Sequence, residues 1–141
     1  MKQIQILLVE DNEGDILLTT EALEDSKIIN KVNVVKDGKL AIDFLNQKEP
    51  FQDALMPNLI LLDINLPKKN GHEVLQYLKA SKNFRHIPII MLTTSSSEKD
   101  ILEAYNNYAN CFITKPVEVN EFMKAVAKIE NFWISIVQLP S

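Results

Sequence analysis

The chain has 141 residues, of which 46% are hydrophobic and 24% charged, so we expect one folded globular domain rather than a disordered segment. Its formal net charge is −4 and no basic run exceeds Lys68-Lys69, which argues against nucleic acid or an anionic membrane surface as a partner. A single cysteine excludes an internal disulfide, and the lack of a signal peptide or a membrane-length apolar run predicts a cytoplasmic protein.

Short apolar runs alternate with longer segments of helical spacing along the chain. The runs are rich in valine, isoleucine and leucine, which is typical of strands buried on both faces. The helical segments carry apolar residues three and four positions apart; the first, for example, places Ile16, Leu17, Thr20 and Leu23 on one side. In chain order we expect strand 4–9, helix 15–25, strand 32–35, helix 38–47, strand 59–62, helix 71–81, strand 87–92, helix 98–108, strand 111–114 and helix 118–131.

A strand followed by a helix, five times over, predicts an α/β fold with a parallel sheet and helices on both faces. Right-handed crossovers and the chain length favour a five-stranded doubly wound, flavodoxin-like sheet with the order 2-1-3-4-5. Ligands of such sheets bind at the carboxyl ends of the strands, near the switch point between strands one and three. The segment 48–58, with two prolines, is interpreted as a plain connecting loop at the opposite end.

Three acidic residues follow strands that this topology makes neighbours. Glu10 and Asp11 end the first strand, and Asp63 ends the third. Three carboxylates in one pocket repel each other unless a cation neutralises them, and an all-oxygen ligand set suits Mg²⁺. Asp15, by contrast, is interpreted as a cap or favourable charge at the start of the first helix.

The fourth and fifth strands end in a hydroxyl-rich run and in a lysine. A hydroxyl within 93–97 could bond a phosphate oxygen, while Ser97 could equally cap the next helix. Lys115 could be an ordinary loop charge, but a pocket with surplus negative charge would attract its ammonium group. The bond to Pro116 is a candidate for a cis peptide.

Over about its first 130 residues the sequence resembles the receiver domains of two-component response regulators. The paired acids of that family resemble Glu10 and Asp11, and its phosphoacceptor resembles Asp63 within LILLDINLPKKNG. Its switch hydroxyl resembles Thr93 within IIMLTTS, and its lysine resembles Lys115 within FITKP. The separations of 30 residues between 63 and 93, and of 22 between 93 and 115, agree with the family pattern.

The resemblance implies that Asp63 accepts a phosphoryl group from a phosphohistidine of a sensor histidine kinase or a phosphotransfer protein. The implied cofactor is Mg²⁺, held by Asp11, Asp63 and the backbone carbonyl of Asn65, with Glu10 acting directly or through water. Such a protein catalyses only its own phosphorylation and dephosphorylation, so it is not an enzyme in the usual sense.

The resemblance also implies how the signal would leave the site. Lys115 would pair with Asp63 and then with the phosphoryl group, and Thr93 would move to bond a phosphoryl oxygen. Phe112, three residues before the lysine, matches the aromatic switch position of the family, although it may equally belong to the core. The output face would comprise the fourth helix, the fifth strand and the fifth helix.

The last residues extend beyond what a receiver needs. We interpret 1–141 as a single receiver domain with a core of 1–130 and a C-terminal extension of 131–141, in which the last helix continues. The ending FWISIVQLP resembles that of the small single-domain regulators paired with cyanobacterial phytochrome kinases, which form homodimers. The alternative is that this tail folds back to complete the core.

Three other functions compete with this interpretation. An aspartyl phosphatase would need a second acid where Asp63-Ile64-Asn65 has an asparagine, and a flavin-binding module would need a phosphate loop where Glu10 and Asp11 would repel phosphate. The serious alternative is a phosphorylation-independent adaptor of receiver fold. Such an adaptor would usually have lost one of the five site residues, and this chain retains all five.

Overall fold

The computed structural model describes residues 3–94, 109 and 111–129, and these form a parallel sheet with helices on both faces. The sheet has five strands in the order β2-β1-β3-β4-β5, so the predicted topology is confirmed. Its strands are β1 (Ile4–Val9), β2 (Asn30–Val35), β3 (Leu59–Asp63), β4 (Ile89–Thr93) and β5 (Cys111–Thr114). Every pairing between neighbouring strands is parallel.

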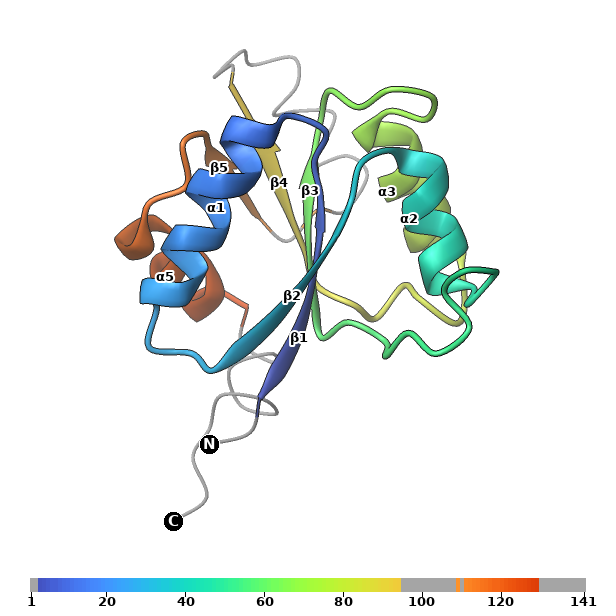
Figure 1. Ribbon diagram of the computed structural model, residues 1–141, viewed down its shortest axis with the longest axis horizontal. Helices are drawn as coiled ribbons and strands as arrows, with labels where there is room; N and C mark the ends of the chain where they lie inside the picture. The colour runs from blue at the N-terminus through green and yellow to red at the C-terminus, as the bar shows by residue number, and fades with distance from the viewer. Residues whose placement is uncertain (1–2, 95–108, 110, 130–141) are drawn as a thin grey trace.

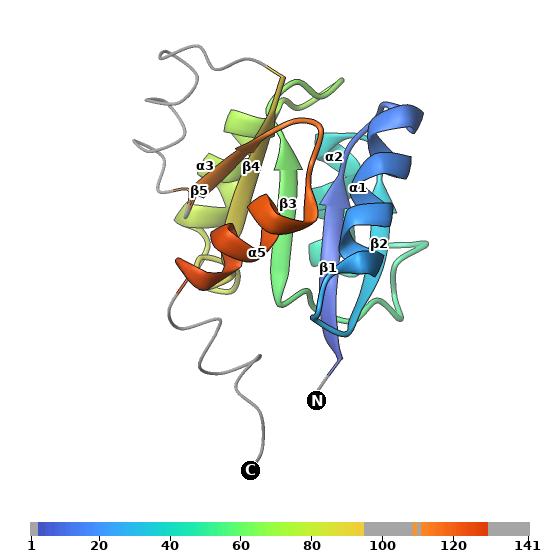
Figure 2. The same ribbon diagram turned by 90° about the vertical axis from the view of Figure 1, so that its left-hand side faces the viewer.

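Helices cover the two faces of the sheet in pairs. Helices α1 and α5 lie on one face, and α2 and α3 lie on the other (Figure 1). The view turned by 90° shows α1 and α5 packed side by side over the sheet (Figure 2). The bounds are α1 (Glu13–Asp25), α2 (Gly38–Leu45), α3 (Gly71–Ala80) and α5 (Val119–Ala127). The helix expected over 98–108 and the extension 131–141 lie outside the described residues.

Burial on both faces explains why the central strands are continuous apolar runs. All five residues of β3 and all five of β4 are buried. Alternate residues of β1 enter opposite cores: Ile6 and Leu8 face α1 and α5, whereas Leu7 and Val9 face α2 and α3. The hydrophobic effect thus fixes the register of the strands, and the strand ends then carry polar residues to a common edge.

Polar caps set where the helices begin. Asn12 caps α1 by accepting a hydrogen bond from the backbone N–H of Asp15, and Asp37 caps α2 in the same way. Asn70 and Glu73 form a reciprocal capping box at the start of α3. The Asn12 cap places the first turn of α1 directly after the acids that end β1.

The inner face of α1 differs from the expected one. The helix buries Thr19, Ala22 and Leu23, whereas the side chain of Leu17 is 57% exposed. Positions 19, 22 and 23 follow the three- and four-residue spacing of a single stripe, and position 17 is turned about 200° from position 19. The prediction that Leu17 points inward was therefore wrong.

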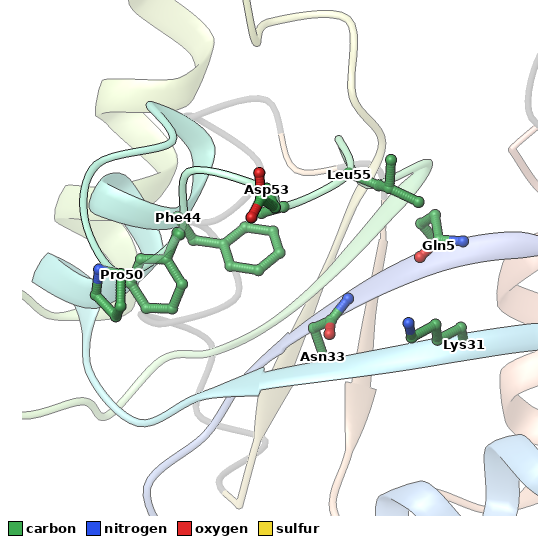
Figure 3. Close-up of a pocket in the computed structure, with 9 residues that line it drawn as sticks. Gln5, Lys31, Asn33, Phe44, Pro50, Asp53 and Leu55 are labelled. Carbon is green, nitrogen blue, oxygen red and sulfur yellow. The ribbon is translucent and has the colours of Figure 1, made fainter.

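The loop 46–58 packs closely at the end of the sheet remote from the acidic residues. The ring of Phe51 lies 5.4 Å from that of Phe44. A pocket of about 340 Å³ lies beside these rings and reaches Gln5, Lys31 and Asn33 on the first two strands (Figure 3). None of the acidic strand-end residues lines this pocket.

No helix within the described residues combines the length and the apolar character that a membrane crossing requires.

Gly71 joins the start of α3 to the backbone of the third strand, and its lack of a side chain is a steric requirement. A Cβ atom there would lie 2.3 Å from the carbonyl oxygen of Asp63, whereas one at Gly14 would lie 3.3 Å from the Asn12 side chain. We therefore expect Gly71→Ala to lower the free energy of unfolding by about 2 kcal/mol or more, measured by urea denaturation. The matched control Gly14→Ala, in the exposed first turn of α1, should stay within about 1 kcal/mol of the wild type. Equal behaviour of the two variants would contradict the argument.

Candidate functional site

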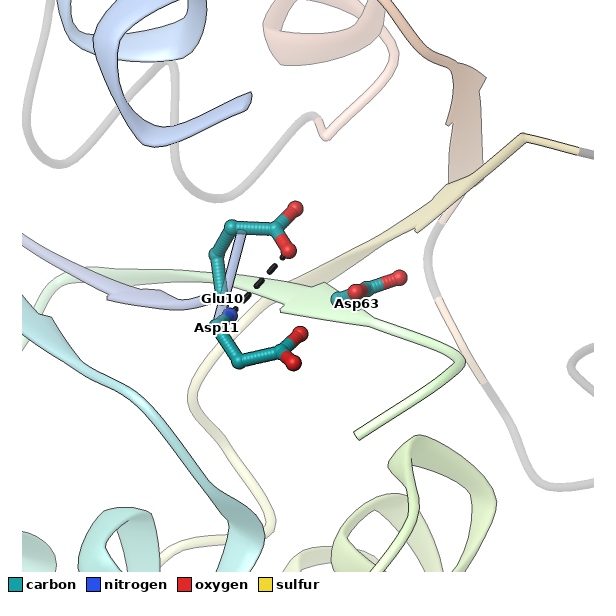
Figure 4. A group of neighbouring side chains, drawn as sticks. All are labelled: Glu10, Asp11 and Asp63. Atoms are coloured by element: carbon teal, nitrogen blue, oxygen red, sulfur yellow. Dashed lines mark hydrogen bonds between the residues drawn. The ribbon is translucent and has the colours of Figure 1, made fainter. Parts of the chain in front are cut away.

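Three carboxylates meet where β1 and β3 end. Val9 pairs with Leu62 in the sheet, so Glu10, Asp11 and Asp63 follow directly on neighbouring strands. Each offers a carboxylate oxygen, and these oxygens all lie within 4.8 Å of one another (Figure 4). Glu10 and Asp63 are buried, whereas Asp11 is exposed. The structure therefore brings together the three acids that the sequence indicates.

Backbone N–H groups hold two of these carboxylates in place. One oxygen of Glu10 accepts hydrogen bonds from the N–H groups of Asp11, at 3.1 Å, and Asn12, at 3.2 Å. The Oδ1 atom of Asp63 accepts one from the N–H of Asn65 at 3.2 Å. These contacts use the turns that follow the strands, so the local backbone orients the acids before any ligand arrives.

Lys115 brings a buried ammonium group to the acids from the end of β5. Its backbone N–H donates to the carbonyl of Thr93 at 2.7 Å, and its bond to Pro116 is cis. The side chain is only 6% exposed, and its Nζ lies 2.8 Å from Glu10 and 3.4 Å from Asp63. The predicted attraction between this lysine and the acidic pocket is thus visible in the geometry.

Asp15 is a fourth carboxylate of this cluster, and the sequence analysis missed it. Its Oδ2 lies 2.9 Å from the Nζ of Lys115. It occupies the first turn of α1, but Asn12 supplies the cap of that helix. One signal in the sequence could have indicated this contact: Asp15 lies in the first helical turn after the acids that end β1. That turn lies at the same edge of the sheet as the acids. Its partner is 100 residues away, so no local pattern identifies the contact.

The remaining candidate residues lie around this cluster. Thr93 is buried at the end of β4, one residue beyond Leu92, which pairs with Asp63. Asn65 is exposed just after the third strand. Phe112 lies on β5 opposite Met91 and packs, half-buried, against the core under α2 and α3. The structure thus gives positions to all seven candidate residues, while their roles remain predictions.

Burial and crowding perturb the charges of the two central groups. Burial raises the pKa of Asp63 from 3.8 to about 7, and the neighbouring Glu10 acts in the same direction against Lys115 and the Asn65 N–H. Burial alone would lower the pKa of Lys115, but its hydrogen bonds to Asp15 and Glu10, together with the charge of Asp63, raise it above its usual value. Lys115 therefore stays positively charged, whereas its charge does not fully balance the negative charge of ionised Asp63.

The donor set fits a hard divalent cation. Carboxylate oxygens of Glu10, Asp11 and Asp63 lie within 4.8 Å of one another, with only Asp11 exposed, and the lysine balances only part of their charge. Oxygen-only sites with a few carboxylates and room for water are those that Mg²⁺ and Mn²⁺ occupy. A cation bound there would favour the ionised form of Asp63 and so oppose the burial and the neighbouring Glu10 that raise its pKa.

Comparisons with known proteins agree with this geometry. A family model for the response regulator receiver domain matches residues 6–127. The chain is 42% identical over 136 residues to Response regulator Rcp1 of Synechocystis sp., with 96% of this chain and 92% of that protein covered. The structure of the phosphorylated cyanobacterial phytochrome response regulator RcpA is similar with a TM-score of 0.80, at 43% identity and with 99% and 100% of the two chains covered. The Mn²⁺-bound form of Rcp1 gives a TM-score of 0.77 at 41% identity, with 98% and 99% covered.

The raised pKa of Asp63 predicts a pH-dependent stability when no divalent cation is present. When folding raises the pKa of a carboxyl, its contribution to stability is fully present at pH values below its pKa in the unfolded state. This contribution is lost as the pH rises through its pKa in the folded state. For Asp63 the loss spans the interval from 3.8 to about 7. In EDTA we therefore expect Asp63→Asn to exceed the wild type in free energy of unfolding by about 2 kcal/mol at about pH 8, with a smaller excess at about pH 5.

Urea denaturation at several pH values measures this difference. Asp53→Asn, which removes an exposed carboxylate of the loop 46–58, is the control for a general change in net charge. An excess for Asp63→Asn that did not vary between these pH values would contradict the electrostatic account of the site.

Proposed function

This chain belongs to the response regulator receiver domain family, and we propose that it is a phosphorylation switch in which Asp63 is the phosphoacceptor. The observation that carries the proposal is the placement of one buried aspartate beside two further acids and a buried ammonium group. One carboxylate oxygen from each of the three acids lies within 4.8 Å of the other two, and the Nζ of Lys115 lies 3.4 Å from Asp63. A nucleophilic carboxylate with a fixed cation beside it is suited to phosphoryl transfer.

The proposed donor is a phosphohistidine of a sensor histidine kinase or of a phosphotransfer protein. A carboxylate oxygen of Asp63 would attack the phosphorus, so that a P–O bond forms while the P–N bond to the imidazole breaks. The imidazole nitrogen would leave with the bonding electron pair. Lys115 would neutralise part of the charge on the transferring group, which is what electrostatic catalysis of this reaction requires. The protein would thus catalyse only its own modification and its reversal.

The proposed cofactor is Mg²⁺. Asp11, Asp63 and the backbone carbonyl of Asn65 would hold it, with Glu10 contributing directly or through water. A bound divalent cation supplies charge neutralisation to the oxygens of a transferring phosphoryl group. The Mn²⁺ recorded for Rcp1 supports the proposal, because a relative of this similarity binds a divalent ion.

The proposed response to phosphorylation runs through Thr93 and Phe112. Thr93 lies at the end of β4 beside Asp63 in the sheet, and its carbonyl accepts the N–H of Lys115. A hydroxyl that moves to bond a phosphoryl oxygen would vacate space that the half-buried Phe112 ring could enter. Among the described elements, the surface that would change is that of β5 and α5.

The proposed partner is a kinase of the phytochrome type, and the proposed location is the cytoplasm. The support is that RcpA, which this chain resembles over nearly its whole length, is a phytochrome response regulator. We further propose that 1–141 is one receiver domain in which the extension 131–141 contributes to a homodimer contact. Size-exclusion chromatography with and without phosphorylation, on the full chain and on a chain ending at residue 130, tests the dimer.

We expect the protein to acquire one phosphoryl group when incubated with acetyl phosphate and Mg²⁺. Intact mass spectrometry should show the adduct on the wild type and not on Asp63→Asn, and mild base should remove it because acyl phosphates are labile. Absence of labelling in the wild type would favour the alternative of a phosphorylation-independent adaptor. Continuous release of phosphate from unrelated esters would favour a phosphatase.

We also expect Mg²⁺ to stabilise the folded protein through the three acids. At a concentration 100-fold above its dissociation constant, a cation that binds only the native state adds about 2.7 kcal/mol to the free energy of unfolding. Thermal unfolding at about pH 8, above the pKa of about 7 of Asp63, should show this gain in the wild type and much less of it in Asp11→Asn. The exposed variant Asp53→Asn is the matched control, and an equal loss in both variants would contradict a specific site.

A further inference from the structure

We propose that Asp15 is a positioning residue, which holds the Lys115 ammonium group in the orientation that the phosphoryl group on Asp63 requires. The inference rests on the proposed function of Asp63 and deepens it. Glu10 contacts the same ammonium group from the end of β1, whereas Asp15 reaches it from helix α1, so the two carboxylates restrain the lysine from different elements.

The first observation is how the donors of Lys115 are divided. An ammonium group has three N–H bonds. Three carboxylates surround this one: Glu10 at 2.8 Å, Asp15 at 2.9 Å and Asp63 at 3.4 Å from Nζ. The first two satisfy the usual distance of a charge-assisted hydrogen bond, and the third is longer. Glu10 and Asp15 thus hold two donors by hydrogen bonds, and the third remains available beside Asp63, which lies at ion-pair distance.

The second observation is that the Asp15 carboxylate is not used to cap α1. The backbone N–H of Asp15 donates to the Asn12 side chain, which is the cap of α1, so its own carboxylate is not needed for capping. Glu10, by comparison, uses one oxygen for the N–H groups of Asp11 and Asn12 and offers only the other to the lysine. Lys115 is the only hydrogen-bond partner of the Asp15 carboxylate among the described residues.

The third observation is the burial of the partner. Ion pairs between exposed side chains contribute little, but loss of one partner of a buried charge is costly. The Lys115 side chain is 6% exposed and that of Asp15 26%. The neighbouring pair on the same turn of α1, Glu13 with Lys36, is 73% and 58% exposed. Glu13 therefore provides a matched control with the same charge on the same turn but without contact to the buried ammonium group.

The pKa of Lys115 supports the same assignment. Burial would lower it, and the hydrogen bond from the ammonium group to Asp15 is the largest of the influences that raise it instead. Without Asp15 the lysine side chain would keep one firm partner, Glu10, and its flexible stem would allow several orientations. Phosphoryl transfer is sensitive to the placement of the neutralising charge, so such freedom would slow it.

The test is a double-mutant cycle on the rate of phosphorylation by acetyl phosphate in saturating Mg²⁺. We expect Asp15→Ala to react about tenfold more slowly than the wild type, and Asp15→Glu to recover part of the rate because it restores the charge. Glu13→Ala should react within about twofold of the wild type. In the Lys115→Ala background, the additional change Asp15→Ala should have no effect, because Asp15 acts through the lysine.

A merely structural role for Asp15 would give a different pattern. The slowing would then persist in the Lys115→Ala background, and that result, or a wild-type rate for Asp15→Ala, would overturn the inference. If Asp15→Ala does not fold, the isosteric Asp15→Asn replaces it in the cycle. If Lys115→Ala reacts too slowly to follow, the apparent affinity for beryllofluoride, measured by calorimetry, replaces the rate. We then expect Asp15→Ala to lower this affinity about tenfold, and to have no effect on it in the Lys115→Ala background.

The outcome also separates this inference from the function on which it rests. If the wild type is not labelled on Asp63 at all, the proposed phosphoacceptor function fails. If the wild type is labelled and Asp15→Ala is labelled as fast, the function stands and only the role of Asp15 fails.

Discussion

The central constraint of this protein is electrostatic: four carboxylates and one ammonium group occupy one edge of the sheet. Lys115 contacts Glu10, Asp15 and Asp63, and Asp11 lies beside them at the exposed side. One positive charge cannot balance four negative ones, and burial together with the neighbouring Glu10 raises the pKa of Asp63 to about 7. The surplus makes the site receptive to a divalent cation, and it explains why a further anionic group could be accepted there only with such a cation present.

The apolar core is what allows so unfavourable a cluster to form. Both faces of the central strands are buried, so their register is set by hydrophobic contacts that do not involve the site. Gly71 permits α3 to begin against the backbone of Asp63, and the cap at Asn12 starts α1 directly beyond the acids. The stability of the rest of the fold therefore offsets the repulsion, as is common where function requires strained electrostatics.

The sequence was informative wherever a signal is local or where topology brings strand ends together. Continuous apolar runs predicted the bounds of β1 and β5 correctly. The strand predicted for β2 was two residues shorter than the observed one, because the observed strand begins with the polar residues Asn30 and Lys31. The convergence of Glu10 and Asp63 followed from the strand order alone.

The failures have a common physical origin, since both concern contacts across the fold. The exposure of Leu17 depends on how α1 is rotated about its axis on the sheet. Consecutive apolar residues in this part of the helix do not determine that rotation. The contact of Asp15 depends on the arrival of Lys115 from the opposite end of the chain. The lysine is consequently more than a counter-ion: its backbone is bonded to the end of β4 at Thr93, and its side chain ties α1 to Asp63. A change in charge on Asp63 would alter how the ammonium group of Lys115 is shared among its three carboxylate partners. It would therefore act both on the first turn of α1 and on the end of β5, which leads into α5.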